Sequence, residues 1–299
     1  MKKIFIPFYS FLNRKPRIKR PTVIMTLLVR DEADIIERHL RYHANRDIDG
    51  LIVTDHQSGD GTRDILEQYK KEGVILALID EPGVAFDQVA WVHRMIELAR
   101  DRYHADYCIN SDADEFWYTA SGSLRNELAR SRAGKIHCPS YMMLPAANGE
   151  FWTATDCVRQ AVPKKFGFKG YNVLFTKPTS KVIHRTQGYR IITPGNHGVE
   201  MSDETRERSK TIRLYHYSIR SKEQFIRKML QSGAALEANK GSPEKEGSHW
   251  RYFYRGHKAG AIDLDQEFHQ VIGTDQITEL RRAGCVITDT TMKQAFSEK

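Results

Sequence analysis

The first 117 residues alternate between two hydrophobic patterns. Residues 22–29 form a nearly continuous apolar run, which is typical of a strand buried on both faces. Further strands are predicted at residues 50–54, 74–79 and 106–111. Between them, apolar residues recur at helical spacing, most clearly over residues 88–100. Strands that alternate with helices predict an α/β fold, with a mostly parallel sheet flanked by helices and joined by right-handed crossovers.

Polar residues mark the expected starts of two helices. Asp31, with Asp34 three residues later, predicts a capping-box-like start for the helix after the first strand. Ser221 and Gln224 predict a capping box ahead of a later run with helical apolar spacing. The chain is therefore expected to divide into a tail over residues 1–21, an α/β domain over 22–220 and a helical extension over 221–299.

Acidic residues follow the predicted strands. Asp55 ends the second strand, and Asp112 and Asp114 follow the fourth at a spacing of two, which on extended backbone directs both carboxylates to one side. Since ligands bind parallel sheets at the carboxyl ends of the strands, these residues and residues 30–32 are expected at one edge. Acidic groups there suit hydrogen bonds to a base and ribose. Asp112 and Asp114 also suit a divalent cation that binds substrate phosphates.

Composition and missing motifs exclude several classes of protein. The 299 residues suffice for one large domain or two small ones, and 40% hydrophobic and 28% charged residues are typical of a globular chain. The four cysteines are scattered without a Cys-x-x-Cys pair, which argues against a zinc cluster and fits the cytoplasm. No Gly-x-Gly-x-x-Gly follows the first strand, which disfavours a dinucleotide fold. No Gly-Lys-Ser/Thr loop is present, which excludes a P-loop NTPase.

The net charge of +8 is concentrated in part near the start of the chain. Residues 4–12 are rich in aromatic and apolar side chains, and residues 14–20 carry five basic ones. Such a segment can rest on the anionic inner face of a membrane, and a flexible basic tail is the open alternative. The apolar part is too short to span a bilayer, and no signal-peptide cleavage site follows it. Nucleic-acid binding, supported by charge alone, is not expected.

Three segments, in this order and at this spacing, resemble the motifs of family-two-type glycosyltransferases with the GT-A fold. They are residues 29–33, 53–62 and 112–116. The second segment departs from the family pattern at His56 and Gln57. The third matches the Asp-x-Asp-Glu-Phe variant of a bacterial subgroup, whose preceding helix also resembles the one with Gln88 and Trp91. More distantly, Lys181, Asn196 and His197 resemble the basic strand and the following histidine of that subgroup.

The resemblance implies a nucleotide-binding half over residues 22–117 and an acceptor half over 118–220. For the nucleotide it implies a contact to the base or ribose by Asp55, and for a divalent metal, Mn²⁺ or Mg²⁺, it implies Asp112, Asp114 and His216 as ligands. Arg30, Glu32 and Asp112 are expected to contact the nucleotide sugar because they lie at the same edge of the sheet. Imidazole beside carboxylates would favour manganese. For His216, between Tyr215 and Tyr217, a hydrogen-bonded structural role stays open. Arg30 and Glu32 have a plain alternative as a solvated side chain and a first-turn acid.

The expected activity is transfer of a sugar, with inversion, from a nucleotide-diphosphate sugar to an acceptor hydroxyl. UDP-sugars are the favoured donors, and a glycan or lipid-linked acceptor in bacterial surface polysaccharide or lipopolysaccharide synthesis is the expected setting. The reaction needs a general base, for which Glu150, Asp156, Glu200 and Asp203 are the candidates. Glu150 is favoured because glycine and aromatic residues flank it. A metal-dependent phosphohydrolase and a non-catalytic nucleotide- or polysaccharide-binding module are the alternatives.

Overall fold

A computed structural model describes residues 16–82, 87–163, 166–168, 171–176, 179–239, 243–244 and 247–297. These residues form two compact units. The first consists of the chain up to Pro82 together with Asp87–Pro139 and Ser180–Leu214. The second consists of Ser140–Thr179 and the chain from Tyr215 onward. Most of the predicted tail, residues 1–15, lies outside the described residues, and the predicted functional domains stay predictions.

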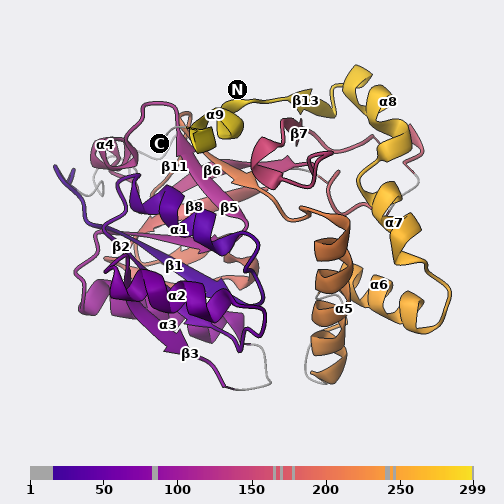
Figure 1. Ribbon diagram of the computed structural model, residues 1–299. Coiled ribbons are helices and arrows are strands. Elements are labelled where there is room, and N and C mark those ends of the chain that lie inside the picture. The colour runs from indigo at the N-terminus through magenta and orange to yellow at the C-terminus, as the bar shows by residue number, and fades with distance from the viewer. Residues whose placement is uncertain are drawn as a thin grey trace, which may run out of the picture. The chain divides into compact units, whose positions relative to one another are not determined.

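Four parallel strands form the centre of the first unit (Figure 1). They lie in the order β4-β1-β2-β3 and correspond to the four predicted strands, to within one or two residues at each end. Their bounds are β1 (Val23–Val29), β2 (Gly50–Asp55), β3 (Ile75–Asp80) and β4 (Tyr107–Asp112). The nearly continuous apolar runs are explained by burial, because almost every residue of β1, β2 and β4 is buried.

Helices flank this sheet as predicted. They are α1 (Ile36–Ala44), α2 (Thr62–Lys71) and α3 (Gln88–Asp101). α1 packs against α2, whereas α3 packs against β1, β2 and β4. The hairpin of β9 (Tyr189–Ile192) and β10 (Val199–Met201) shares a hydrophobic core with α3, which includes Ile24, Ile52 and Ile96.

The sheet continues beyond β4 with antiparallel pairing. β8 (Ser180–Arg185) lies antiparallel to β4 and to β6 (Lys135–Met143), and β11 (Arg206–Arg208) lies parallel to β6. β5 (Glu115–Thr119) pairs with β12 (Ile212–His216), and α4 (Leu124–Arg130) precedes β6. β6 and β12 each begin in the first unit and end in the second.

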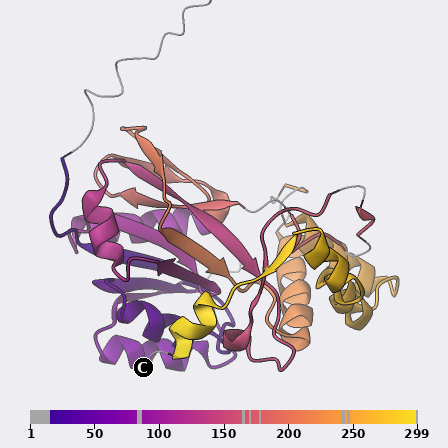
Figure 2. The ribbon, with the colours of Figure 1, turned by 90° about the horizontal axis from the view of Figure 1, so that it is seen from above.

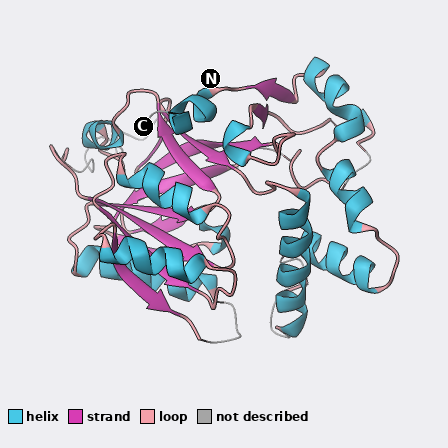
Figure 3. Ribbon diagram, viewed as in Figure 1, coloured by secondary structure: helices cyan, strands magenta, loops and turns pink. Residues whose placement is uncertain are grey.

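The second unit is largely helical, which confirms the predicted helical C-terminal part (Figure 3). Its helices are α5 (Lys222–Ala238), α6 (Ser248–Lys258), α7 (Leu264–Val271), α8 (Ile277–Arg282) and α9 (Thr291–Ser297). α5 packs against α6 and α7 around Phe225, Phe253 and Phe268 (Figures 1 and 2). β7 (Asp156–Val158) pairs with the end of β6 and with β13 (Val286–Thr288). No helix among the described residues is long and apolar enough to cross a membrane.

The two predicted helix starts have different outcomes. The prediction for Asp31 is wrong, because α1 begins after Ile35 without a side-chain cap and Asp31 has left-handed backbone with φ 53°. Its carboxylate instead accepts a hydrogen bond from the backbone of Gly59. The prediction for Ser221 is confirmed, since its hydroxyl accepts from the N–H of Gln224 at 3.1 Å. The Gln224 side chain accepts in return from Arg220 N–H, one residue before the cap.

Candidate functional site

The strand order has a switch point at β1 in the central sheet. β2 and β3 lie on one side of β1, whereas β4 lies on its other side, so the strand order reverses at β1. In open α/β sheets, ligands bind outside the carboxyl ends of the strands at such a switch point. Asp112 is aligned with Leu28, and Asp55 with Val29 and Asp80. The structure therefore brings the acidic strand ends to one edge, as the sequence predicted.

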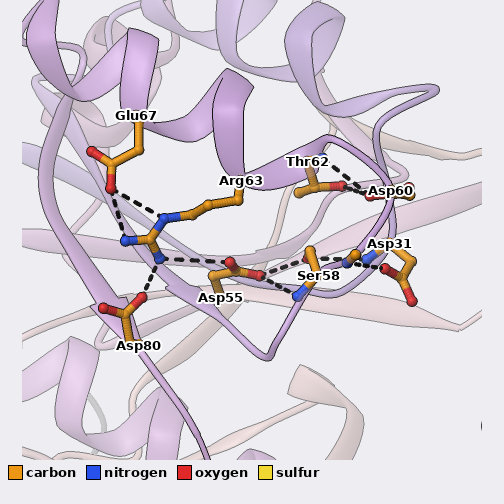
Figure 4. A network of polar contacts seen from close by, with 9 residues as sticks. Asp31, Asp55, Ser58, Asp60, Thr62, Arg63, Glu67 and Asp80 are labelled. Carbon is orange, nitrogen blue, oxygen red and sulfur yellow. Dashed lines mark hydrogen bonds and ion pairs between the residues drawn. The ribbon is translucent and has the colours of Figure 1, made fainter.

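The loops after β1 and β2 are hydrogen-bonded to each other at this edge (Figure 4). The Gly59 N–H donates to Asp31 Oδ1 at 2.8 Å, and the Asp31 N–H donates to Ser58 Oγ at 3.1 Å. The Glu32 N–H donates to Thr62 Oγ1 at 2.9 Å. These bonds join two loops that are distant in sequence into one rim. They also require left-handed backbone at Asp31, a conformation that non-glycine residues adopt mainly where the surroundings enforce it.

Asp55 is held at the end of β2 with its charge compensated. Its Oδ1 accepts hydrogen bonds from the N–H and hydroxyl of Ser58 at 3.2 and 2.6 Å. Its Oδ2 lies 3.6 Å from an Arg63 guanidinium nitrogen, and Arg63 also pairs with Asp80 and, at 2.8 Å, with Glu67 (Figure 4). The Asp55 side chain is almost completely buried, so only a small part of the carboxylate is accessible to a ligand.

Asp112 belongs to a buried charge cluster that sequence reasoning did not assign. The Lys181 Nζ donates to Asp112 Oδ2 at 3.0 Å and lies 2.9 Å from Glu115 Oε1, while its side chain is only 4% exposed. Burial by itself would lower the pKa of Lys181, but the charges of Asp112 and Glu115 more than offset it, so the pKa is raised. Glu115 also accepts from the Asp112 N–H at 3.1 Å. Lys181 therefore stays protonated and fixes both carboxylates.

A short turn supplies the second contact to Asp112. Asn196, at the end of the 3-10 segment Pro194–Asn196, donates from its side-chain amide to Asp112 Oδ1 at 3.3 Å. The backbone N–H of Gly195 donates in turn to Gln88 Oε1 at 2.9 Å, which ties this turn to the start of α3. Gln88, Lys181 and Asn196 appear in the sequence only as features of the resemblance. Tertiary structure places Lys181 and Asn196 against Asp112, and Gln88 against the turn that carries Asn196.

Asp114 lies deeper than its partner in the motif. It is 3% exposed, in the turn between β4 and β5. His39 of α1 is fully buried nearby. Burial lowers the pKa of His39 to about 4, although the Ala113 backbone, Asp114 and Asp112 act in the opposite direction. His39 is therefore neutral at pH 7. The adjacent His43 accepts from the Trp117 N–H at 3.1 Å and contacts the His39 carbonyl at 3.0 Å, which assigns its proton to Nδ1.

The described residues suit a metal site that is completed by substrate phosphates, but not one built from protein side chains alone. They contain no group of three or more His, Cys, Asp or Glu side chains arranged to hold a metal ion. A hard cation such as Mg²⁺ commonly uses one or two carboxylates together with substrate phosphates, however, and needs no complete protein cage. The Asp112 side chain is 36% exposed and could serve in that way. His216, at the end of β12, belongs to the second unit, so its role stays a prediction.

The remaining predicted site residues are placed as follows. Arg30 is exposed, with its Nε 3.8 Å from Asp31 Oδ2. The Glu32 carbonyl accepts from the N–H groups of Ile35 and Ile36, so Glu32 helps to start α1 through its backbone. Glu150 is exposed in the second unit and accepts from the side-chain amide of Asn148 at 3.2 Å. Their predicted roles in nucleotide contact and base catalysis stay predictions.

The chain is similar to several solved structures at low identity. No family model and no curated protein matches it. It matches the crystal structure of S. aureus TarS 1-349 at 12% identity, over 88% of this chain and 92% of that chain, with a TM-score of 0.39. It matches the mannosyltransferase PcManGT from Pyrobaculum calidifontis, in complex with GDP-Man and Mn²⁺, at 14% identity over 94% and 86% of the two chains, with a TM-score of 0.44.

A second crystal structure of S. aureus TarS matches at 13% identity with a TM-score of 0.38, over 79% of this chain. This chain spans 43% of the length of that structure. At these identities and scores, the similarity does not assign an activity to this chain.

Proposed function

We propose that this chain is a glycosyltransferase of the GT-A type, which transfers a sugar from a nucleotide-diphosphate sugar to an acceptor hydroxyl with inversion. The observation that carries the proposal is Asp112, whose partly exposed carboxylate is fixed at the sheet switch point by Lys181 and Asn196. Asp55 lies two strands away at the same edge, about 10 Å across the sheet at the usual strand spacing. Two fixed carboxylates at this separation suit the nucleoside and diphosphate ends of one donor.

In this proposal the rim residues bind the nucleoside part. The edge of Asp55 would accept a hydrogen bond from the base or ribose. Arg30, which is exposed beside Asp31, would reach a phosphate or ribose, with Glu32 contributing from the same loop. The hydrogen bonds between the two loops keep these groups in place before the donor arrives, which limits the ordering cost of binding.

Asp112 is the proposed protein ligand of a divalent cation, Mn²⁺ or Mg²⁺, with Asp114 and His216 as further candidates. When bound, the cation would neutralise the diphosphate charge and so make the nucleotide a good leaving group. The part of this chain is to keep Asp112 correctly oriented. Lys181 does so, because its ammonium donates a hydrogen bond to Asp112 Oδ2 at 3.0 Å.

The acceptor hydroxyl would attack the anomeric carbon from the face opposite the nucleotide, with its proton passing to a carboxylate. We propose Glu150 for that base, since it is exposed and held by Asn148. UDP-sugars are the first donors to test, and a glycan or lipid-linked acceptor in bacterial surface polysaccharide or lipopolysaccharide synthesis is the proposed setting. We place the protein in the cytoplasm, with its N-terminal segment at the inner face of the membrane.

The test measures thermal stability with a panel of nucleoside diphosphates, with and without Mn²⁺ or Mg²⁺. At roughly 100 times its dissociation constant, a ligand stabilises the native state by about 2.7 kcal/mol. We expect a metal-dependent shift with wild type that is lost in Asp112→Asn. Asp275→Asn is the matched control, because Asp275 is exposed in the second unit and should respond like wild type.

Turnover then separates the alternatives. Release of nucleoside diphosphate from a nucleotide sugar, with a product of inverted anomeric configuration, is the expected result. Phosphate release that depends on Asp112 would instead favour the phosphohydrolase. Nucleotide binding without turnover of any donor would favour the binding module. If no nucleotide stabilises wild type, the transferase proposal fails.

A further inference from the structure

A cavity of about 420 Å³ in the first unit is lined by arginines. Its lining consists of Arg17, Arg130, Arg132 and Arg206 together with Ala133, Thr205 and Glu207. Four guanidinium groups and one carboxylate leave a net of three positive charges. We call these seven residues the arginine pocket.

The arginine pocket lies at the sheet edge opposite the proposed active site. Lys135, at the start of β6, is aligned with His184 of β8, and His184 is aligned with Cys108 near the start of β4. Residues 130–133 immediately precede β6, whereas Asp112 ends β4. The pocket is therefore near the amino ends of β4 and β6 and is separate from Asp112 at the carboxyl end of β4.

Buried contacts fix the backbone segments that carry these arginines. Arg185, which is 2% exposed, donates from one guanidinium nitrogen to the Pro16 carbonyl at 2.9 Å and to the Ser131 carbonyl at 3.2 Å. It thereby holds the segment with Arg17 beside the segment with Arg132. The Gly134 and Lys135 N–H groups donate to the Thr205 hydroxyl and carbonyl at 2.9 and 3.0 Å, which fixes the position of Arg206.

The guanidinium groups themselves are largely uncompensated. Among the described residues, the side chains of Arg17, Arg132 and Arg206 make no hydrogen bond or ion pair, whereas Arg130 pairs with Glu127 at 3.3 Å. The surrounding field is positive. The pKa of His137 is lowered by partial burial and then by the charges of Lys135, Arg206 and Arg208. Arginines that share one cavity and outnumber its carboxylates are suited to bidentate binding of a phosphate group.

We propose that the arginine pocket binds the phosphate of an anionic lipid headgroup and so attaches the first unit to a membrane surface. The positive charge of the arginine pocket indicates a phosphate ligand. The sequence before Arg17 indicates that this phosphate belongs to a lipid. Residues 4–12, which come shortly before Arg17, are rich in aromatic and apolar side chains and are followed by basic ones. That combination favours a membrane interface over a soluble anion. The proposal goes beyond the transferase activity and does not depend on it.

Vesicle flotation of the full-length chain tests the proposal without any assay of activity. The vesicles contain phosphatidylcholine alone or phosphatidylcholine with phosphatidylglycerol. The test variant is Arg132→Gln/Arg206→Gln, which should fold normally because both side chains are exposed and neither makes a hydrogen bond or ion pair among the described residues. The control is Arg190→Gln/Arg282→Gln, which removes the same charge at two exposed arginines outside the pocket.

We expect wild type and the control to bind the vesicles that contain phosphatidylglycerol and to release them as salt is raised. At the usual contribution of a basic residue near an anionic surface, the pocket variant should partition roughly 30-fold less strongly. Equal binding by the pocket variant and the control would overturn the proposal, as would equal binding to both kinds of vesicle. Glycerol phosphate or RNA that binds through these arginines, with no vesicle binding, would also overturn it.

Discussion

Lys181→Met would remove the ammonium that now lies about 3 Å from two carboxylates, those of Asp112 and Glu115. Methionine has a similar length and is apolar and flexible enough for a buried position, so the substitution changes the charge much more than the packing. Glu115 is fully buried and would lose the positive charge of Lys181 at 2.9 Å, whereas Asp112 is partly exposed and could be stabilised by water instead. The cost should therefore come mainly from the buried Glu115 carboxylate.

The size of the effect follows from burial and distance. At 3 Å and an effective dielectric constant of about 20, each ion pair corresponds to roughly 5 kcal/mol before desolvation is subtracted. Breaking a buried pair by removing one partner typically costs about 3–5 kcal/mol, and we expect Lys181→Met to lie in that range. In wild type, the raised pKa of Lys181 means that its stabilisation is complete below the usual lysine pKa and is lost only as pH rises through the folded value.

Urea unfolding at pH 7 and at pH 5 measures this directly. In Lys181→Met, the pKa of the Glu115 carboxyl should rise, so the deficit in unfolding free energy should be largest at pH 7 and shrink as the pH is lowered. Adding Glu115→Gln should recover part of the loss. Lys222→Met is the control, because Lys222 pairs with Asp265 at the surface and such pairs contribute little. A loss of less than about 1 kcal/mol in Lys181→Met would refute the reasoning.

Two further predictions concern stability. Burial lowers the pKa of His39 and His184 to about 4, so protonation of the unfolded chain should reduce the unfolding free energy as pH falls from 6.5 to 4, by about 3 kcal/mol for each histidine. Urea unfolding should show a smaller fall in His184→Gln, and an unchanged fall would contradict the assignment. Gly134→Ala would place a Cβ 2.8 Å from the Asp203 carbonyl oxygen and should cost about 1–3 kcal/mol. Gly59→Ala meets no atom within 4 Å, so a similar loss of thermal stability in both variants would count against this steric explanation.

The periodicity of apolar residues was sufficient to predict the central sheet. Strands such as β1 and β2 are buried almost throughout, so their composition reflects burial directly. The helix start at Ser221 was also readable, because a cap involves residues only three positions apart. At Asp31 the same kind of local signal failed. The Asp31 carboxylate does not cap α1, because it accepts a hydrogen bond from Gly59 in the loop after β2 instead.

The sequence by itself determined the α/β class, the four central strands and the gathering of acidic residues at one sheet edge, because these depend on local periodicity and strand direction. Tertiary structure decided what surrounds those residues. Lys181 reaches Asp112 because β8 pairs antiparallel with β4, and the arginine pocket forms because Arg185 joins the chain near Pro16 to the chain near Ser131. Such contacts depend on strand order and register between distant segments. A local pattern of polar and apolar residues carries no information about either.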